Sequence, residues 1–221
     1  QIYIFIFIFA LMENSYVVPV THASLGSKLS ITVNCNQTLA TINPKLWGTY
    51  TRGAASIPQG LTTALVYVDL QRSGVFPKSG NANANPDDPN EYDFSVIDQN
   101  VKGAVSAGLD PLIKIWSVPV VMSKDHHPLS PPKDNKQYSN VVSHIVQHLT
   151  QGWANGSRYP LKYFEFWNEP DLRGGIFWKG TQDEFFATFE STVKAIKSVN
   201  PQFVVGGPGF AWPEYTRPSP W

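Results

Sequence analysis

Short apolar runs alternate along the chain with segments whose apolar residues recur at helical spacing. The runs have the length and the β-branched and aromatic content of buried strands. They predict five strands, at residues 46–50, 65–70, 111–116, 161–167 and 203–207. Helical spacing predicts helices from Ser95 to about Gly108, across 141–149, and from the capping box of Thr181 and Glu184 to about Asn200.

Strands that alternate with helices in this way are typical of a parallel sheet with helices packed outside it. Between the first two predicted strands, Gly53, Pro58 and Gly60 interrupt the chain, so no helix is expected there. The Pro-rich stretch 126–137 is expected to be a loop. The pattern alone is compatible with an open doubly wound sheet and with a closed barrel.

Composition narrows the class of protein. Hydrophobic residues make up 42% of the 221 residues, which is enough to bury a core and excludes a disordered chain. The 17 basic and 17 acidic side chains cancel, so we expect no nucleic-acid partner. The single cysteine, Cys35, excludes a disulfide framework and a multi-cysteine metal cluster.

The first residues carry a different signal. Ile2 to Met12 is an unbroken apolar run, whose helix would rise about 16 Å and could not span the hydrocarbon core. Its length is typical of a secretory signal peptide, here residues 1–23 without the basic n-region, with cleavage after Ala23. An N-terminal strand is the alternative. The acceptor sequences at Asn36 and Asn155 agree with a secreted glycoprotein that keeps no membrane span.

Candidate chemistry lies at the end of the fourth predicted strand, in Trp167-Asn168-Glu169-Pro170. Pro170 disfavours the α region for the residue before it, so Glu169 is expected to stay extended. In parallel α/β sheets and barrels, reactive side chains sit at the carboxyl ends of strands. Glu169 is therefore placed for proton transfer, beside the amide of Asn168.

Asn168-Glu169-Pro170 resembles the acid/base motif of glycoside hydrolases with (β/α)8 barrels. Its surroundings resemble glycoside hydrolase family 39, which includes β-xylosidases and α-L-iduronidases. The segments that carry this resemblance are 84–98, 126–156, 163–172, 177–186, 195–201 and 204–209. The resemblance implies a TIM (β/α)8 barrel, of which residues 24–221 would be the N-terminal part, truncated to about the first five βα units.

The resemblance also implies a reaction. The substrate would be a carbohydrate, cleaved at an O-glycosidic bond with retention and without a metal or other cofactor. Glu169 would be the general acid/base, and Asn168 would bind the sugar 2-hydroxyl. A catalytically inactive carbohydrate-binding barrel is the alternative. A nucleotide-binding loop at Gly206-Gly207-Pro208-Gly209 is disfavoured, because Pro208 removes a backbone amide that could bind phosphate.

Retention requires a second carboxyl about 5 to 5.5 Å from the first. In the family's superfamily this nucleophile ends the seventh strand, so we expect it beyond residue 221 and expect the chain alone to be inactive. Alternation places Glu165 on the side of Glu169 but about 13 Å earlier along the strand, which is too far. Glu214 is a weak candidate, and Asp171 is expected to be a turn or ion-pair residue.

A few other side chains are candidates for contact with the sugar. Trp116, Trp178 and Trp212 could stack on sugar faces, although core packing explains each equally well. His127 follows the third strand and could contact substrate, with ordinary loop polarity as the alternative. His144 and His148 have the spacing of a metal-binding pair, but a solvated or helix-packing role is favoured because no glutamate accompanies them.

Overall fold

The computed structural model describes residue 43 and residues 48–51, 60–172 and 175–211. The chain divides into two compact units, 1–46 and 47–221, and every described helix and strand belongs to the second. The proposed signal peptide, Asn36, the stretch 52–59, Trp212 and Glu214 lie outside the described residues.

Five parallel strands form one sheet, in the order β1-β2-β3-β4-β5. The strands are β1 Gly48–Thr51, β2 Thr63–Asp69, β3 Asp110–Trp116, β4 Tyr163–Phe166 and β5 Val204–Gly206. All five were predicted to within a few residues. The second ends one residue early, because Leu70 already begins a short helix that the Asp69 carboxylate caps.

Helices follow β2, β3 and β4. They are α1 Leu70–Ser73, α2 Ser95–Ser106, α3 Asn135–Thr150 and α4 Gln182–Val199, with the short 3-10 turns η2 Pro89–Glu91, η3 Val120–Met122 and η4 Trp153–Asn155. The expected loop 126–137 ends early: Asp134 accepts hydrogen bonds from the amides of Lys136 and Gln137, so α3 begins at Asn135. The predicted capping box of α4 is confirmed.

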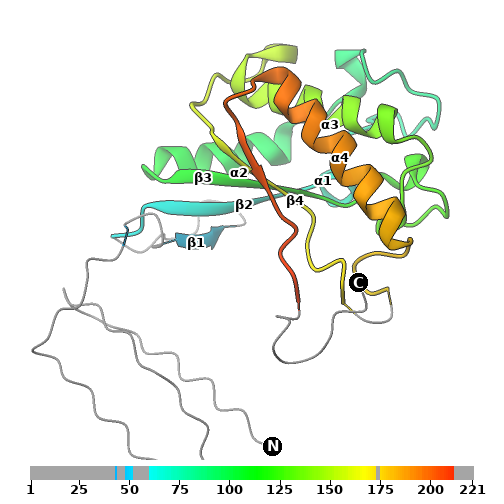
Figure 1. The fold of residues 1–221 in the computed structure, drawn as a ribbon. Coiled ribbons are helices and arrows are strands. Elements are labelled where there is room, and N and C mark those ends of the chain that lie inside the picture. Colours follow the sequence, from blue (N-terminus) through cyan, green and yellow to red (C-terminus); the bar gives the residue numbers. More distant parts are fainter. Residues whose placement is uncertain (1–42, 44–47, 52–59, 173–174, 212–221) are drawn as a thin grey trace, which may run out of the picture. The chain divides into compact units, whose positions relative to one another are not determined.

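One face of the sheet packs against the described helices, and no described helix lies on the other face. Figure 1 shows α2, α3 and α4 on the same side of the strands. On β2 the buried residues Ala64, Val66 and Val68 alternate with partly exposed ones, which is the pattern of a strand with one packed face. A doubly wound sheet reverses its strand order and covers both faces, so the uninterrupted order indicates the wall of a barrel.

The helix layer buries its two histidines rather than solvating them. On α3, the ring of His144 stacks on Trp153 at 4.2 Å, and that of His148 stacks on Phe94 at 3.5 Å. Burial lowers the pKa of His144. Both side chains therefore pack the helix, and among the described residues no group of three or more His, Cys, Asp or Glu side chains could hold a metal.

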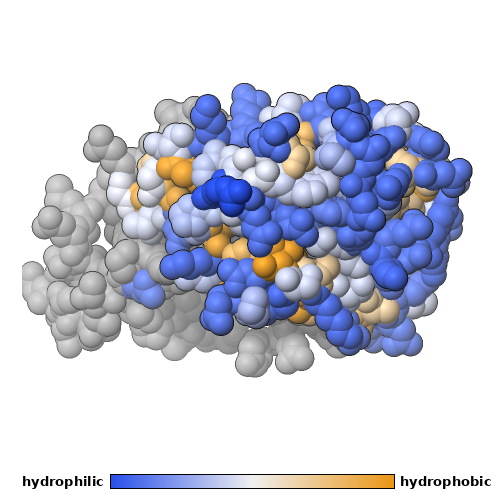
Figure 2. Space-filling view, turned by 90° about the horizontal axis from the view of Figure 1, so that it is seen from above, coloured by the Kyte–Doolittle hydropathy of each residue, from blue (hydrophilic) through white to orange (hydrophobic). Residues whose placement is uncertain are grey.

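The outer face of the helices is mostly hydrophilic, with apolar side chains only in small separate areas (Figure 2). Over the described part of the chain, no helix combines the length and apolar character needed to cross a bilayer.

Candidate active site

Strand β4 ends in a turn that leaves the extended conformation. The amide of Trp167 still donates to the carbonyl of Ile115 at 2.9 Å, but its φ of 72° ends the alternation of side chains. The indole of Trp167 is fully buried, and its Nε1 donates to the carbonyl of Phe177 at 2.7 Å. These bonds and the packing of the ring hold a bulky residue in a left-handed conformation that it disfavours.

Glu169 follows in the same turn, and the expectation that it stays extended is wrong. Its φ is 44°, a left-handed conformation that the effect of Pro170 does not predict and that depends on longer-range contacts. The amide of Glu169 donates to the carbonyl of Gly209 at 2.7 Å, and its carbonyl accepts from Leu172 at 3.1 Å. The half-buried Glu169 is thus fixed at the carboxyl end of β4 by its own backbone.

Asp171 links this turn to the loop after β5. Its side chain is fully buried, and its Oδ1 accepts a hydrogen bond from the amide of Ala211 at 3.0 Å. This agrees with the expectation of a turn residue. Together with the bond between Glu169 and Gly209, it ties the loop after β5 to the turn that carries the acid/base candidate.

A polar cluster occupies the face of the sheet on which no described helix lies. Tyr67, Lys114 and Glu165 lie in one row, since they are register partners on β2, β3 and β4. The Nζ of Lys114 is 2.8 Å from Glu165 Oε1 and 2.8 Å from Asn168 Oδ1, and it lies 5.2 Å from the centre of the Tyr67 ring. The carboxylate of Glu165 is therefore engaged in an ion pair.

This cluster also corrects the argument from alternation. Counting in twos from Glu165 placed Trp167 and Glu169 on the same side. Instead, Asn168 shares the ammonium of Lys114 with Glu165, while Trp167 is buried. The positive φ at Trp167 interrupts the alternation, so the side chains after it are displaced by one position relative to the count in twos.

Trp116 lies at the carboxyl end of β3. It is half-buried and makes edge-to-face contacts with Tyr67, Trp167 and Phe177, at centroid distances of 6.4, 6.4 and 5.8 Å. Its indole Nε1 is buried and has no hydrogen-bond partner in the described part of the chain. The half-buried ring at a strand end suits the apolar C–H face of a sugar.

A hollow of about 330 Å³ adjoins Trp116, between the end of β2 and the start of α2. Tyr67, Asp69 and Arg72 also line it. A larger hollow of about 590 Å³ lies between Pro86-Asp87 and the helices α3 and α4, and none of its lining residues is at a strand end. The smaller hollow is therefore the better candidate for ligand binding.

His127 and Trp178 differ in their availability to a ligand. His127 is half-buried in the loop after β3, and its Nδ1 accepts from the amide of Leu129 at 3.1 Å. Trp178 is only 2% exposed; it packs edge-to-face on Trp167 and Phe185, and its Nε1 donates to the carbonyl of Thr181. Trp178 thus belongs to the core, the alternative that the sequence left open.

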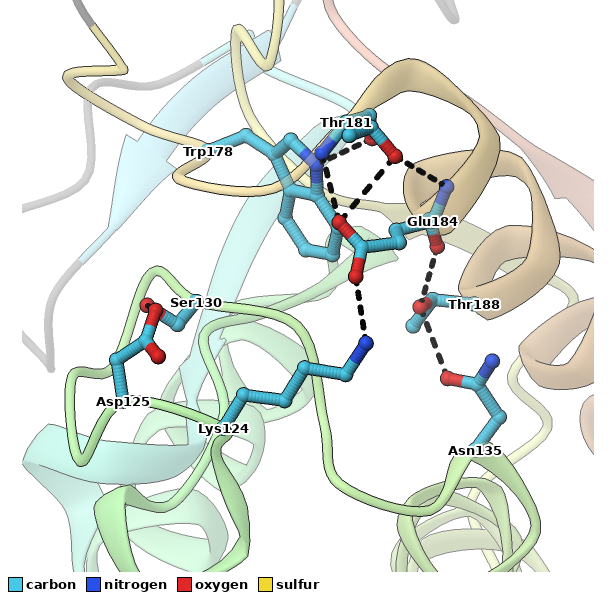
Figure 3. Close-up of polar contacts among 8 residues, drawn as sticks. All are labelled: Lys124, Asp125, Ser130, Asn135, Trp178, Thr181, Glu184 and Thr188. Carbon is cyan, nitrogen blue, oxygen red and sulfur yellow. Dashed lines mark hydrogen bonds and ion pairs between the residues drawn. The ribbon is translucent and has the colours of Figure 1, made fainter.

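Figure 3 shows how this core tryptophan is anchored at the start of α4. Glu184 accepts hydrogen bonds from the amide of Thr181 at 2.8 Å and from Lys124 Nζ at 2.5 Å. The bond from Lys124, with that from Thr181, holds the pKa of Glu184 below its usual value. The loops after β3 and β4 therefore share one anchor (Figure 3).

Comparison with known proteins now identifies the family. The family model described as glycosyl hydrolases family 39 matches residues 77–218, a range that includes the Glu169 turn and the strands β3, β4 and β5. The chain belongs to glycosyl hydrolases family 39. The predicted family is confirmed, and so is the fold class: α/β, the five-stranded part of a TIM barrel.

Two curated relatives show how much of a longer protein the chain matches. The chain is 28% identical over 134 residues to a β-xylosidase from Caldicellulosiruptor saccharolyticus and 30% identical over 130 residues to one from Geobacillus stearothermophilus. These alignments cover 58% and 53% of the chain, and 27% and 24% of the two β-xylosidases. The chain thus matches about a quarter of the length of these curated relatives.

A solved structure gives the same picture in three dimensions. A glucosidase from Croceicoccus marinus superimposes with a TM-score of 0.61 at 28% identity, covering 75% of the chain and 37% of the glucosidase.

Sequence reasoning found Glu169, Asn168 and Trp116, which the structure brings to one edge of the sheet. It missed Lys114 and Tyr67. Their signal was present, because Tyr67 and Lys114 interrupt apolar strands at positions that alternation places on the face opposite the helices.

Proposed function

We propose that the protein hydrolyses O-glycosidic bonds with retention of configuration, with Glu169 as the general acid/base. The observation that carries this proposal is the position of Glu169: half-buried at the carboxyl end of a barrel strand, held by Gly209, and adjacent to an amide that is itself held. Membership of family 39 supports the same reaction class.

The chemistry follows from the protonation state of Glu169 in each half-reaction. In the first, the protonated carboxyl gives its proton to the leaving glycosidic oxygen while a second carboxylate attacks the anomeric carbon. In the second, the Glu169 carboxylate takes a proton from water, which displaces the sugar from the covalent intermediate. We place the nucleophile outside the described residues, beyond residue 221, since Glu165 is already paired with Lys114.

The substrate is proposed from the site and from the relatives' names. Trp116 would stack on a sugar ring at the 330 Å³ hollow, Asn168 would bind the sugar 2-hydroxyl, and His127 would contact substrate from the next loop. Two relatives are β-xylosidases and one is a glucosidase, so aryl β-xylosides and β-glucosides are the first substrates to test.

The experiment uses a full-length form that includes the proposed nucleophile, because the 221 residues alone are expected to be inactive. It compares Glu169→Gln with Asp183→Asn, a control that neutralises an exposed carboxylate on α4. Loss of a general acid costs about 10²- to 10⁴-fold in rate, and the loss shrinks when the leaving group needs no proton. We therefore expect Glu169→Gln to abolish turnover of alkyl xylosides while dinitrophenyl xyloside still releases dinitrophenol in a first turnover. The control should keep full activity on both.

Equal losses on the two leaving groups would contradict the acid/base role. No turnover by the unmodified full-length protein, together with binding of xylo-oligosaccharides, would favour the inactive carbohydrate-binding barrel instead. Nuclear magnetic resonance of the first anomer released would test retention directly.

We also propose that the protein is secreted after removal of residues 1–23 and glycosylated. Asn155 supports this, because it is exposed in the turn that follows α3. Mass spectrometry of the secreted protein would show whether residues 1–23 are removed. Comparison before and after enzymatic deglycosylation would show whether Asn36 and Asn155 carry glycans.

A further inference from the structure

Lys114 carries a positive charge in an unusual place. It is 4% exposed and stands on the face of β3 that the helices do not cover. A buried ammonium needs hydrogen-bonding partners to offset the loss of hydration. Those partners are Glu165 Oε1 and Asn168 Oδ1, each at 2.8 Å, and the ring of Tyr67.

These partners determine which way the amide of Asn168 faces. A lysine ammonium has three donors and no acceptor, so the amide atom that faces it must be the oxygen. The hydroxyl of Tyr67 also approaches that oxygen, at 3.4 Å. The oxygen is thereby occupied, and the two N–H groups of Nδ2 have no acceptor in the described part of the chain.

Glu165 determines where the ammonium lies. The pair is enclosed by the loop after β5, since a Cβ added to Gly209 would lie 3.3 Å from Glu165 Oε1 and 3.5 Å from Lys114 Nζ. The ammonium therefore has little room to move away from Asn168, and the carboxylate balances its charge. Without Glu165, a buried positive charge would be left without an ionic partner.

We propose that Lys114 is a positioning residue: fixed by Glu165, it orients Asn168 so that Nδ2 donates to a sugar hydroxyl oxygen next to the scissile bond. The proposal deepens the proposed function and rests on it. It implies that this hydroxyl accepts a hydrogen bond from Asn168, so its own O–H must donate a hydrogen bond to another group.

The kinetic test, made in the same full-length protein, is a double-mutant cycle between Lys114→Met and Asn168→Ala, measured on a β-xyloside and on its 2-deoxy analogue. Hydrogen bonds to the 2-hydroxyl strengthen in the transition state of glycoside hydrolysis. We expect Lys114→Met to lower kcat/KM on the xyloside by roughly 10- to 100-fold, mainly through kcat, and by much less on the 2-deoxy analogue.

The double variant should be no slower than Asn168→Ala, because Lys114 acts through that amide. Additive losses, or equal losses on the two substrates, would overturn the proposal. Lys114→Met leaves Glu165 unpaired and can lower the yield of folded protein. A second variant, Lys114→Met with Glu165→Leu, removes both charges and should show the same kinetic defect.

A spectroscopic readout separates this proposal from the proposed function. In ¹⁵N-labelled protein, Lys114→Met should shift the side-chain amide signals of Asn168 and leave those of Asn140 unchanged, since Asn140 donates to Asp87 elsewhere. If Glu169→Gln showed no acid/base defect but these signals still shifted, the proposed reaction would be contradicted and the positioning role of Lys114 would be supported. Unchanged Asn168 signals would overturn the positioning role whatever the activity.

Discussion

Replacing Gly207 with alanine should destabilise the edge of the sheet next to Glu169. Gly207 has a φ of 103°, and an added Cβ would lie 2.6 Å from the carbonyl oxygen of Phe166 and 3.0 Å from Glu165 Cγ. A side chain at positive φ costs about 1–2 kcal/mol, and overpacking costs about 1–3 kcal/mol. We therefore expect Gly207→Ala to lower the free energy of unfolding by about 2–5 kcal/mol.

The neighbouring glycine provides a matched control. A Cβ at Gly206 would meet no atom within 4 Å, so Gly206→Ala should change the free energy of unfolding by less than about 0.5 kcal/mol. Urea denaturation followed by tryptophan fluorescence would measure both variants. Equal stability of the two would refute the close approach of the loop to β4.

Gly207→Ala should also reduce activity. The residue stands two positions before Gly209, whose carbonyl accepts the hydrogen bond from the amide of Glu169. A shift of the loop would loosen that bond, so in the full-length protein kcat should fall in Gly207→Ala and stay unchanged in Gly206→Ala.

Further predictions concern the helix α4 and its anchor. Thr192→Val should raise the free energy of unfolding by about 1 kcal/mol, because the buried hydroxyl of Thr192 has no partner in the described structure. Thr188→Val should lower it by a similar amount, because the hydroxyl of Thr188 donates to Asn135. Thermal denaturation of the two variants tests these opposite signs. Trp178→Phe should lower the free energy of unfolding by roughly 1–3 kcal/mol and leave KM within about twofold. A large rise in KM would indicate instead that Trp178 contacts the ligand. The pKa of Glu184 is lowered in the folded protein, so the ionised Glu184 stabilises the fold. This contribution to the free energy of unfolding is present above the usual glutamate pKa of 4.5 and is lost as the pH falls. Glu184→Gln should therefore flatten the loss of stability on acidification, and an unchanged acid limb in denaturation curves would contradict this.

Local signals predicted most of the fold. The strands were found because β-branched and aromatic runs lie between Gly and Pro residues, and the start of α4 was found because Thr181 and Glu184 form a capping box. The choice between barrel and doubly wound sheet needed the strand order, which depends on contacts between distant segments.

The candidate site was predictable in its residue types and not in its geometry. Glu169 and Asn168 were found from a motif at a strand end. Their orientation depends on the positive φ at Trp167 and on Gly209, about forty residues later, and no local pattern indicates either. The pair of Lys114 and Glu165 likewise depends on the register of β3 and β4.

The conformation of Trp167 has a consequence for how this turn can change during evolution. Its backbone, with a φ of 72°, favours glycine, whereas its buried ring and the bond from Nε1 to Phe177 require tryptophan. A change to glycine would relax the backbone and remove the ring, and a change to another large residue would keep the strain without the bond. The two demands conflict at one position, two residues before the acid/base candidate. Drift at this position is therefore restricted by packing as well as by chemistry, even though Trp167 itself never has to touch the substrate.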